Sequence, residues 1–228
     1  MVNQVRNLND IRRQGNLGLY KRWILNSKTD YHKLCDYMQK INFSIQDLNS
    51  EIEYLQEPRM KNIIYVIILV VWIKEASEKF FKLYKKEVIN NFFYASDSKM
   101  EKVKRFIDAL RSFVVAHPLS TSRHKDFGFD GSFICVDIRT SKKDITFAFV
   151  KDDEIYHLDY DGLHRKKQPS DFYLYVYSDK DDGMKYFRYI GCKISDIYRV
   201  ADLYIDKLYA LDTFLSKQKQ SLYGEINE

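Results

Sequence analysis

The sequence predicts an α+β fold made of an N-terminal helical bundle, an antiparallel sheet and a C-terminal helix. Apolar residues recur with the helical period up to about residue 117, with a period of two from about residue 133, and with the helical period again from about residue 195. Of the 228 residues, 45% are hydrophobic, 30% are charged, 8 are Gly and 3 are Pro. These values are typical of a globular protein with a sizeable core. We divide the chain into a helical domain (1–125), an antiparallel β-sheet region (126–193) and a C-terminal helix (194–228).

Charge and cysteine content limit the class of protein. The net charge of +5 permits an anionic partner such as nucleic acid without requiring one. The three cysteines lie far apart with no CxxC, which fits a reducing compartment and excludes a cysteine-based zinc site of ordinary spacing. The N-terminus lacks the apolar region of a signal peptide, and the longest apolar run, Ile63 to Ile73, is much shorter than the roughly 20 residues of a membrane span. We therefore expect a cytoplasmic protein with no membrane partner.

The first two elements of the helical domain are an N-terminal segment and a helix. Residues 1–26 are polar and basic with a weak helical spacing, and they predict either a short helix or a loose, solvated arm. A helix follows over about residues 30–41, with Thr29 or Asp30 as its N-cap. Residues 42–44 are a candidate break before a continuation that ends at Pro58.

A long helix is predicted from Arg59 to about Tyr94, because this stretch contains neither Gly nor Pro. Its first half, Ile63 to Ile73, is apolar on all sides, which is typical of a helix that is buried all round. We expect it to be the central helix of a bundle or a helix shared with a dimer partner. The β-branched residues of this half make a strand the competing prediction, but the run is too long for an ordinary strand.

The next helix begins near Ser98, which forms a capping box with Glu101. Its apolar stripe consists of Met100, Val103, Phe106, Ile107, Leu110, Phe113 and Val114. Pro118 cannot continue a helix, so the helix should end close to His117.

The sheet region alternates apolar and polar residues in five short runs, which predict an antiparallel meander. The expected strands are residues 133–139, 145–150, 155–160, 172–177 and 184–190. Tyr173, Tyr175 and Tyr177 alternate along the fourth strand, so one face should be aromatic. The final helix begins at Ser195 or Asp196, and it either returns to the bundle or covers the sheet.

Arginine, histidine and hydroxyl side chains are concentrated around the end of the helix that begins near Ser98. On a helical wheel His117 falls in the apolar stripe, seven residues after Leu110, and Arg111 falls at the edge of that stripe. Histidine is the natural acid or base near neutral pH, and arginine binds phosphate oxygens. Cleavage of RNA by its own 2′-OH needs these two roles and no metal or cofactor. Further side chains that can donate hydrogen bonds to phosphate follow directly, namely Ser120, Thr121, Ser122, Arg123 and His124.

A purely structural interpretation of the same residues stays open. A histidine at a helix C-terminus can cap carbonyl groups and complement the helix dipole. Arg111 can pair with Asp108, three residues before it. Residues 120–125 can be no more than a polar connector.

The segment Arg111-Ser-Phe-Val-Val-Ala-His117 resembles the R-x(4–6)-H motif of the HEPN superfamily. These helical-bundle proteins occur in prokaryotic toxin–antitoxin and phage-defence systems and among some eukaryotic RNases. The resemblance implies a homodimer that cuts RNA without metal, with Arg111 stabilising the phosphate and His117 as general acid or base. It also implies an antitoxin protein as a possible partner. The chain departs from the family in having Ser112 where Asn, Asp or His often follows the arginine, and in inserting a sheet before the last helix.

Two other groups of residues in the sheet region could have a function of their own. His157, Asp159, Asp161 and His164 have side chains that suit a divalent metal, but alternation and the Asp-Gly turn keep them from sharing one face, so no metal site is predicted. The tyrosine-rich strands support the alternative function, a non-catalytic protein that binds a ligand or partner through its sheet and dimerises through its helices.

Overall fold

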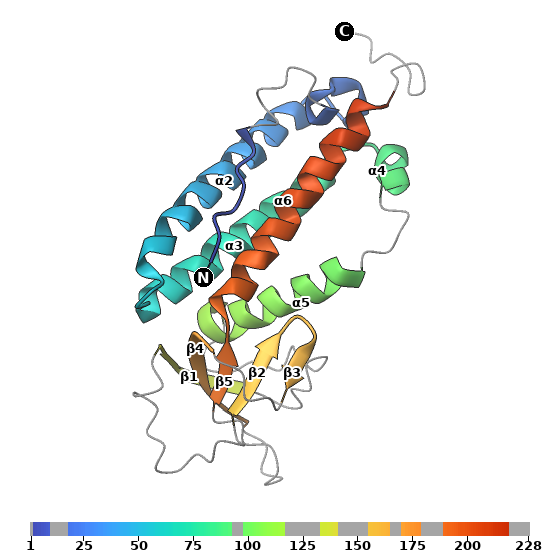
Figure 1. Cartoon of the computed structure of the whole chain (residues 1–228). Coiled ribbons are helices and arrows are strands. Elements are labelled where there is room, and N and C mark those ends of the chain that lie inside the picture. The colour runs from blue at the N-terminus through green and yellow to red at the C-terminus, as the bar shows by residue number, and fades with distance from the viewer. Residues whose placement is uncertain are drawn as a thin grey trace, which may run out of the picture.

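The structure is a computed structural model that describes residues 2–9, 18–92, 98–116, 133–140, 155–164, 170–178 and 189–218. The fold is α+β, as the sequence predicts. Long helices pack side by side, and a sheet lies beyond one end of them (Figure 1). No helix in these ranges is both long enough and apolar enough to cross a bilayer.

Helix α3 (Met60–Phe81) is the element to which the other long helices pack. Helices α2 (Asp30–Glu51), α5 (Ser98–Arg111) and α6 (Ile194–Ser216) all contact it. The prediction of a helix is confirmed and the strand alternative is wrong. Burial is almost complete around its apolar half, but Tyr65 and Trp72 remain 36% and 39% exposed. One narrow stripe of α3 is therefore left uncovered.

Helix α2 runs without a break through residues 42–44, where a break was expected. Asn42, at the expected break, and Asn49, two turns later, bind the N-terminal arm with their side chains. Asn49 accepts a hydrogen bond from the Val5 amide (2.8 Å) and donates one to the Val5 carbonyl (2.9 Å), and Asn42 accepts one from the Leu8 amide (3.0 Å). A helix need not end at such residues when their side chains point to a partner instead of their own backbone.

The N-terminal arm, residues 2–8, is clamped rather than solvated. Val5 and Leu8 are buried in the core. The Arg6 guanidinium lies 3.6 Å from the centroid of the Tyr209 ring on α6, and the Tyr209 hydroxyl donates to the Asn7 carbonyl (2.7 Å). The arm thus runs between α2 and α6 (Figure 1), and the interpretation as a solvated end is wrong for these residues. Residues 10–17, where a short helix was the alternative, lie outside the described ranges.

The predicted single helix over residues 59–94 is wrong, because α3 ends at Phe81 and a separate helix α4 spans Lys86–Phe92. The turn between them pairs with the segment that follows two short 3₁₀ turns, η1 (Gly18–Tyr20) and η2 (Arg22–Ile24). The Lys85 amide donates to the Ile24 carbonyl (2.8 Å), and the Asn26 amide donates to the Leu83 carbonyl (2.9 Å). The Asn26 side chain also donates to the Lys82 and Tyr84 carbonyls. These bonds replace the helical ones and explain a break at which the sequence has no Gly or Pro.

Helix α5 buries the predicted apolar stripe from Val103 to Leu110. It continues into a π-helical turn, η4 (Ser112–Ala116), whose residues Ser112, Phe113 and Val114 are buried. The turn contacts α3 and the first strand of the sheet, so it joins the bundle to the sheet.

The five described strands form one sheet, but not the predicted antiparallel meander. They are β1 (Phe133–Arg139), β2 (Ile155–Asp159), β3 (Gly162–His164), β4 (Phe172–Ser178) and β5 (Tyr189–Cys192). Their order is β1-β4-β5-β2-β3, and β2 pairs with β5 in parallel. Alternation identifies which residues form strands and which faces they share, but it says nothing of neighbours, which is why the order was wrong. The expected strand at 145–150 and most of the one at 184–190 lie outside the described residues.

The two faces of the sheet differ in chemistry. One face packs on the helices through Leu158, Leu174 and Ile190, which belong to the same core as the bundle. The other face carries Tyr173, Tyr175 and Tyr189, and the rings of Tyr175 and Tyr189 lie 5.3 Å apart. The predicted aromatic face is therefore confirmed for Tyr173 and Tyr175.

Helix α6 starts directly after β5 and returns to the bundle, which resolves the open alternative. At its first residue, the Ile194 amide donates to the Asp171 carboxylate (2.8 Å). At its far end, the Lys21 ammonium donates to the carbonyls of Leu215 and Ser216. Both ends of the helix thus have partners for groups that a helix leaves unpaired.

We predict that Asn49→Ala releases the N-terminal arm. The substitution removes both bonds to the Val5 backbone, so it should lower the free energy of unfolding by about 1 to 2 kcal/mol and speed amide exchange at Val5. Gln46→Ala, an exposed position on the same helix, is the control. Hydrogen exchange at Val5 that matches the wild type would show that these bonds do not hold the arm.

Candidate functional site

Arg111, the arginine of the predicted catalytic pair, is the last residue of α5. Its side chain is 47% exposed, and its Nη1 lies 3.7 Å from Oε1 of Glu75 on α3, whose side chain is 43% exposed. A long ion pair between two half-exposed groups contributes little to stability. The guanidinium is therefore held near α3 and is also within reach of a solute.

Arg111 is one of three charged residues by which α5 meets α3. Asp108, the partner that the sequence offered to Arg111, instead accepts a 2.7 Å bond from the Lys74 ammonium. The Lys74 side chain is only 6% exposed, whereas that of Asp108 is 33% exposed, so the ammonium is the desolvated partner of this pair. Two turns before Arg111, Lys104 lies 3.6 Å from Glu78. Residues 104, 108 and 111 share one face of α5 at the i, i+4, i+7 spacing, and among them the pair of Asp108 with the buried Lys74 is the one that fixes α5 on α3.

The other predicted site residues, His117, Ser120, Thr121, Ser122, Arg123 and His124, lie outside the residues that the structure describes. The helical wheel that put His117 in the apolar stripe assumed 3.6 residues per turn. That spacing does not hold through the π-helical turn Ser112–Ala116, in which the hydrogen bonds join residues five apart. The angle between Arg111 and His117 therefore does not follow from the wheel.

An exposed apolar surface lies on the same side of α3 as Glu75. We define the α3 stripe as Tyr65, Ile68 and Trp72, which follow one another at helical spacing and are exposed or half-buried. The Lys40 ammonium of α2 lies 3.3 Å from the centroid of the Trp72 ring. Aromatic and apolar side chains that remain in solvent on a well-packed helix are typical of an interaction surface.

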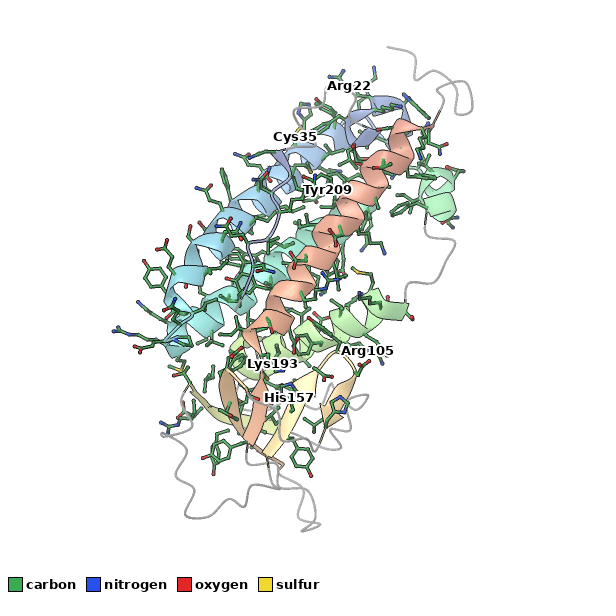
Figure 2. The ribbon with its side chains drawn as sticks, in the orientation of Figure 1. Arg22, Cys35, Arg105, His157, Lys193 and Tyr209 are labelled. Atoms are coloured by element: carbon green, nitrogen blue, oxygen red, sulfur yellow. The ribbon has the colours of Figure 1, made fainter. Side chains whose placement is uncertain are left out.

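A second polar cluster lies on the outer face of the sheet. Figure 2 shows His157 in the sheet near Lys193, which precedes α6. His157 is 2% exposed, and burial lowers its pKa, so the ring is held neutral. Its Nδ1 lies 3.1 Å from Oγ of Ser170. A Cβ on Gly191 would come within 2.2 Å of that hydroxyl, so only glycine leaves room for the contact.

The acidic residues around His157 have separate partners. Asp159 lies 2.9 Å from Nε2 of His164, and Asp161 lies 2.7 Å from the Lys102 ammonium. At the start of α6, burial and the nearby Asp159 raise the pKa of Asp196 to about 6. Within the described ranges, no three His, Cys, Asp or Glu side chains converge as a metal site.

The contact between His157 and Ser170 was not foreseen from the sequence. The two residues are 13 positions apart and belong to no motif, and only strand order brings them together. Because His157 is only 2% exposed, the pair fits a structural hydrogen bond that holds Ser170 against the sheet. It does not resemble a nucleophile and base that face a substrate.

Comparisons with protein-family models, with curated proteins and with solved structures gave no match. Function must accordingly be inferred from the chemistry of the residues in this chain.

We predict that Asp108→Ala destabilises the fold far more than Arg111→Ala. The first substitution leaves the buried Lys74 ammonium without its carboxylate, which should lower the free energy of unfolding by about 2 to 4 kcal/mol. The second removes a half-exposed pair and should cost less than about 1 kcal/mol.

Urea denaturation measures both effects. The double variant Lys74→Met/Asp108→Ala serves as the control, since it removes the unpaired charge and should recover part of the loss. Equal destabilisation by Asp108→Ala and Arg111→Ala would contradict the proposed difference between the two ion pairs.

Proposed function

We propose that the chain is a HEPN-like, metal-independent endoribonuclease of toxin–antitoxin or phage-defence type, with Arg111 and His117 as its catalytic pair. The observation that carries this proposal is the π-helical turn. It spans the same five residues, Ser112–Ala116, that separate the two residues of the motif. Turns of this kind are rare and occur frequently at functional sites. The chain therefore departs from α-helical geometry directly after the exposed arginine of the motif, and this supports a functional role for the segment.

The proposed chemistry uses only side chains. His117 takes the proton from the ribose 2′-OH or gives one to the departing 5′-oxygen, and the new bond from the 2′-oxygen to phosphorus replaces the bond to the 5′-oxygen. Arg111 stabilises the charge that builds up on the phosphoryl oxygens during this exchange. Ser120, Thr121, Ser122, Arg123 and His124 are the proposed contacts to the RNA backbone.

The pairing of Arg111 with Glu75 is compatible with this role. At 3.7 Å and with both side chains nearly half exposed, the pair is weak and well solvated. A phosphate can displace Glu75, because it can accept two parallel hydrogen bonds from a guanidinium with which Glu75 makes only a long contact of 3.7 Å. Glu75 then acts as a holder that keeps Arg111 oriented before RNA binds.

A homodimer is the second part of the proposal, and the α3 stripe is the surface that supports it. Ile68 lies at the middle of the stripe, and Lys61 and Glu75 lie seven residues to either side of it. A two-fold axis at Ile68 would bring Lys61 of each copy opposite Glu75 of the other and Tyr65 beside Trp72. Such self-complementarity is what an isologous interface requires. Each Arg111, beside Glu75 of its own copy, would then lie toward Lys61 of the other copy.

The tyrosine-rich face supports the alternative function, binding of a ligand or partner, less well. Tyr175 is the accessible member of the cluster, whereas Tyr173 and Tyr189 are only 2% and 7% exposed. Rings that are already buried offer little surface to a partner.

We predict RNA cleavage in the presence of EDTA that depends on the motif. Arg111→Ala and His117→Ala should each reduce the cleavage rate by at least about 100-fold, because each removes a transition-state contact or a proton donor. Growth after induced expression gives a second readout, with recovery expected in both variants. Arg105→Ala, an exposed arginine on the same helix (Figure 2), is the matched control and should leave cleavage unchanged. Cleavage or toxicity that persists in both motif variants would refute the assignment.

We also predict that the α3 stripe mediates dimerisation. Ile68→Glu and Trp72→Glu each place a carboxylate in the apolar centre of the proposed interface, so each should convert a dimer to a monomer at micromolar concentration. Ala210→Glu, an exposed position on α6, is the control. Sedimentation velocity measures the mass, and a dimer that survives both stripe variants would place the interface elsewhere.

A further inference from the structure

A separate groove opens on the bundle where the end of α3, the start of α4, the start of α5 and the middle of α6 meet. Its volume is about 560 Å³, which is within the range of small-molecule sites. We call it the lysine groove after the four lysines that line it: Lys82, Lys86, Lys104 and Lys207. Figure 1 shows α4 and α5 on the same side of α6.

The groove has an excess of positive charge. Its four lysines face two glutamates, Glu78 and Glu101. Glu78 and Lys104 lie 3.6 Å apart and offset each other, and Oε1 of Glu78 also accepts a bond from the Tyr204 hydroxyl (3.1 Å). The excess charge therefore comes from Lys82, Lys86 and Lys207 against Glu101. Lys82 and Lys86 are exposed at the rim. The groove is thus prepared for an anion of more than one charge.

Apolar side chains also line the groove, and they set the shape of the ligand. Phe81, Ile89 and Met100 are half-buried members of its wall. Phe and Met are both good contact surfaces for a flat aromatic group. A fatty acid, by contrast, would bring only a single carboxylate to the lysines of the groove.

The shape of the groove rim depends on hydrogen bonds from Asn26 to the turn between α3 and α4. Lys82 and Lys86 flank the turn that ends α3 and starts α4, and Asn26 holds that turn by donating to the carbonyls of Lys82 and Tyr84. Because α3 ends at Phe81, Lys82 and Lys86 belong to this turn and to α4. The segment from residue 24 to 26 thereby fixes one rim of the groove.

We infer that the lysine groove binds a nucleoside phosphate, either as a free nucleotide or at the end of an RNA strand. The lysines receive the phosphate oxygens as charge-assisted donors, and the base rests on Phe81 and Met100. Lys104 precedes Arg111 by two turns of α5, about 10 Å along the helix. The groove is thus distinct from the proposed catalytic residues, and it stands whether or not Arg111 takes part in RNA cleavage.

Isothermal titration at low salt tests this site with AMP, adenosine and two pentanucleotide RNAs that differ only in a 5′-phosphate. AMP should bind at least about tenfold more tightly than adenosine, and Lys82→Ala/Lys86→Ala should weaken AMP binding by at least about tenfold, as expected for the loss of charge-assisted contacts. Lys28→Ala/Lys79→Ala removes two exposed lysines outside the groove and should leave the affinity within about twofold. All four positions are exposed, so the variants should fold, which circular dichroism checks.

The pentanucleotides identify the source of the ligand. Tighter binding of the 5′-phosphorylated strand than of AMP supports an RNA end, and equal or weaker binding supports a free nucleotide. No binding of AMP or of either strand at about 5 mM, equal affinity for AMP and adenosine, or equal losses in the two double variants would each overturn the inference. RNA cleavage is not read in this experiment, so a failure of the proposed catalysis and a failure of the groove are distinguished.

Discussion

The apolar surface of α3 is the constraint on which the rest of the structure depends. A helix whose residues from Ile63 to Ile73 are apolar on nearly every side cannot lie at a surface, because each exposed aliphatic side chain would forgo about 1.5 to 3 kcal/mol of burial. Helices α2, α5 and α6 supply the cover, and the N-terminal arm seals the seam between α2 and α6. These three helices do not cover the whole surface of α3, and the α3 stripe is the part that stays exposed. The proposed dimer follows from the same requirement, since a second copy is the cover that one chain does not provide.

Position along α3 is fixed by charge as well as by packing. Lys74 is buried and needs Asp108, and this pair sets the register of α5 on α3. Arg111 and Lys104 then take their places beside Glu75 and Glu78. Beyond Arg111 the π-helical turn buries Phe113 and reaches β1, while Asp171 ties the sheet to the first residue of α6. The sheet is therefore attached to the bundle at the end of α5 and at the start of α6. The candidate catalytic arginine lies at the first of these junctions.

The sequence carried enough information for the helices and their buried faces, because each apolar stripe is a local property with a fixed period. Strands were recognisable for the same reason, and β1 and β4 lie where alternation predicted. The predictions that were wrong concern features that depend on contacts between residues far apart in the sequence. The break after Phe81 is made by Asn26, 56 and 58 residues away from the carbonyls it binds, and no local signal marks it. The parallel pairing of β2 with β5, the clamp on the arm and the partner of Arg111 are likewise contacts between remote segments. At the site, Arg111 at the edge of the apolar stripe was predictable, whereas the π-helical turn was not, because Ser-Phe-Val-Val-Ala has no residue that forbids an ordinary helix.

The two proposed sites both use residues of α5. They can be separated by mutation because neither site depends on the buried Lys74 and its partner Asp108. Residues 104 and 111 lie on one face of the helix, each beside a glutamate of α3, but only the desolvated pair between them carries much of the stability. Arg111 can lose its side chain with little effect on the position of α5, and Lys82 and Lys86 can do so without disturbing Lys74. An arrangement in which the buried pair holds the helix leaves the flanking cations available for anions. That division of roles, with one buried charge pair for structure and exposed cations for ligands, is the physical reason to look for phosphate chemistry at both ends of α5.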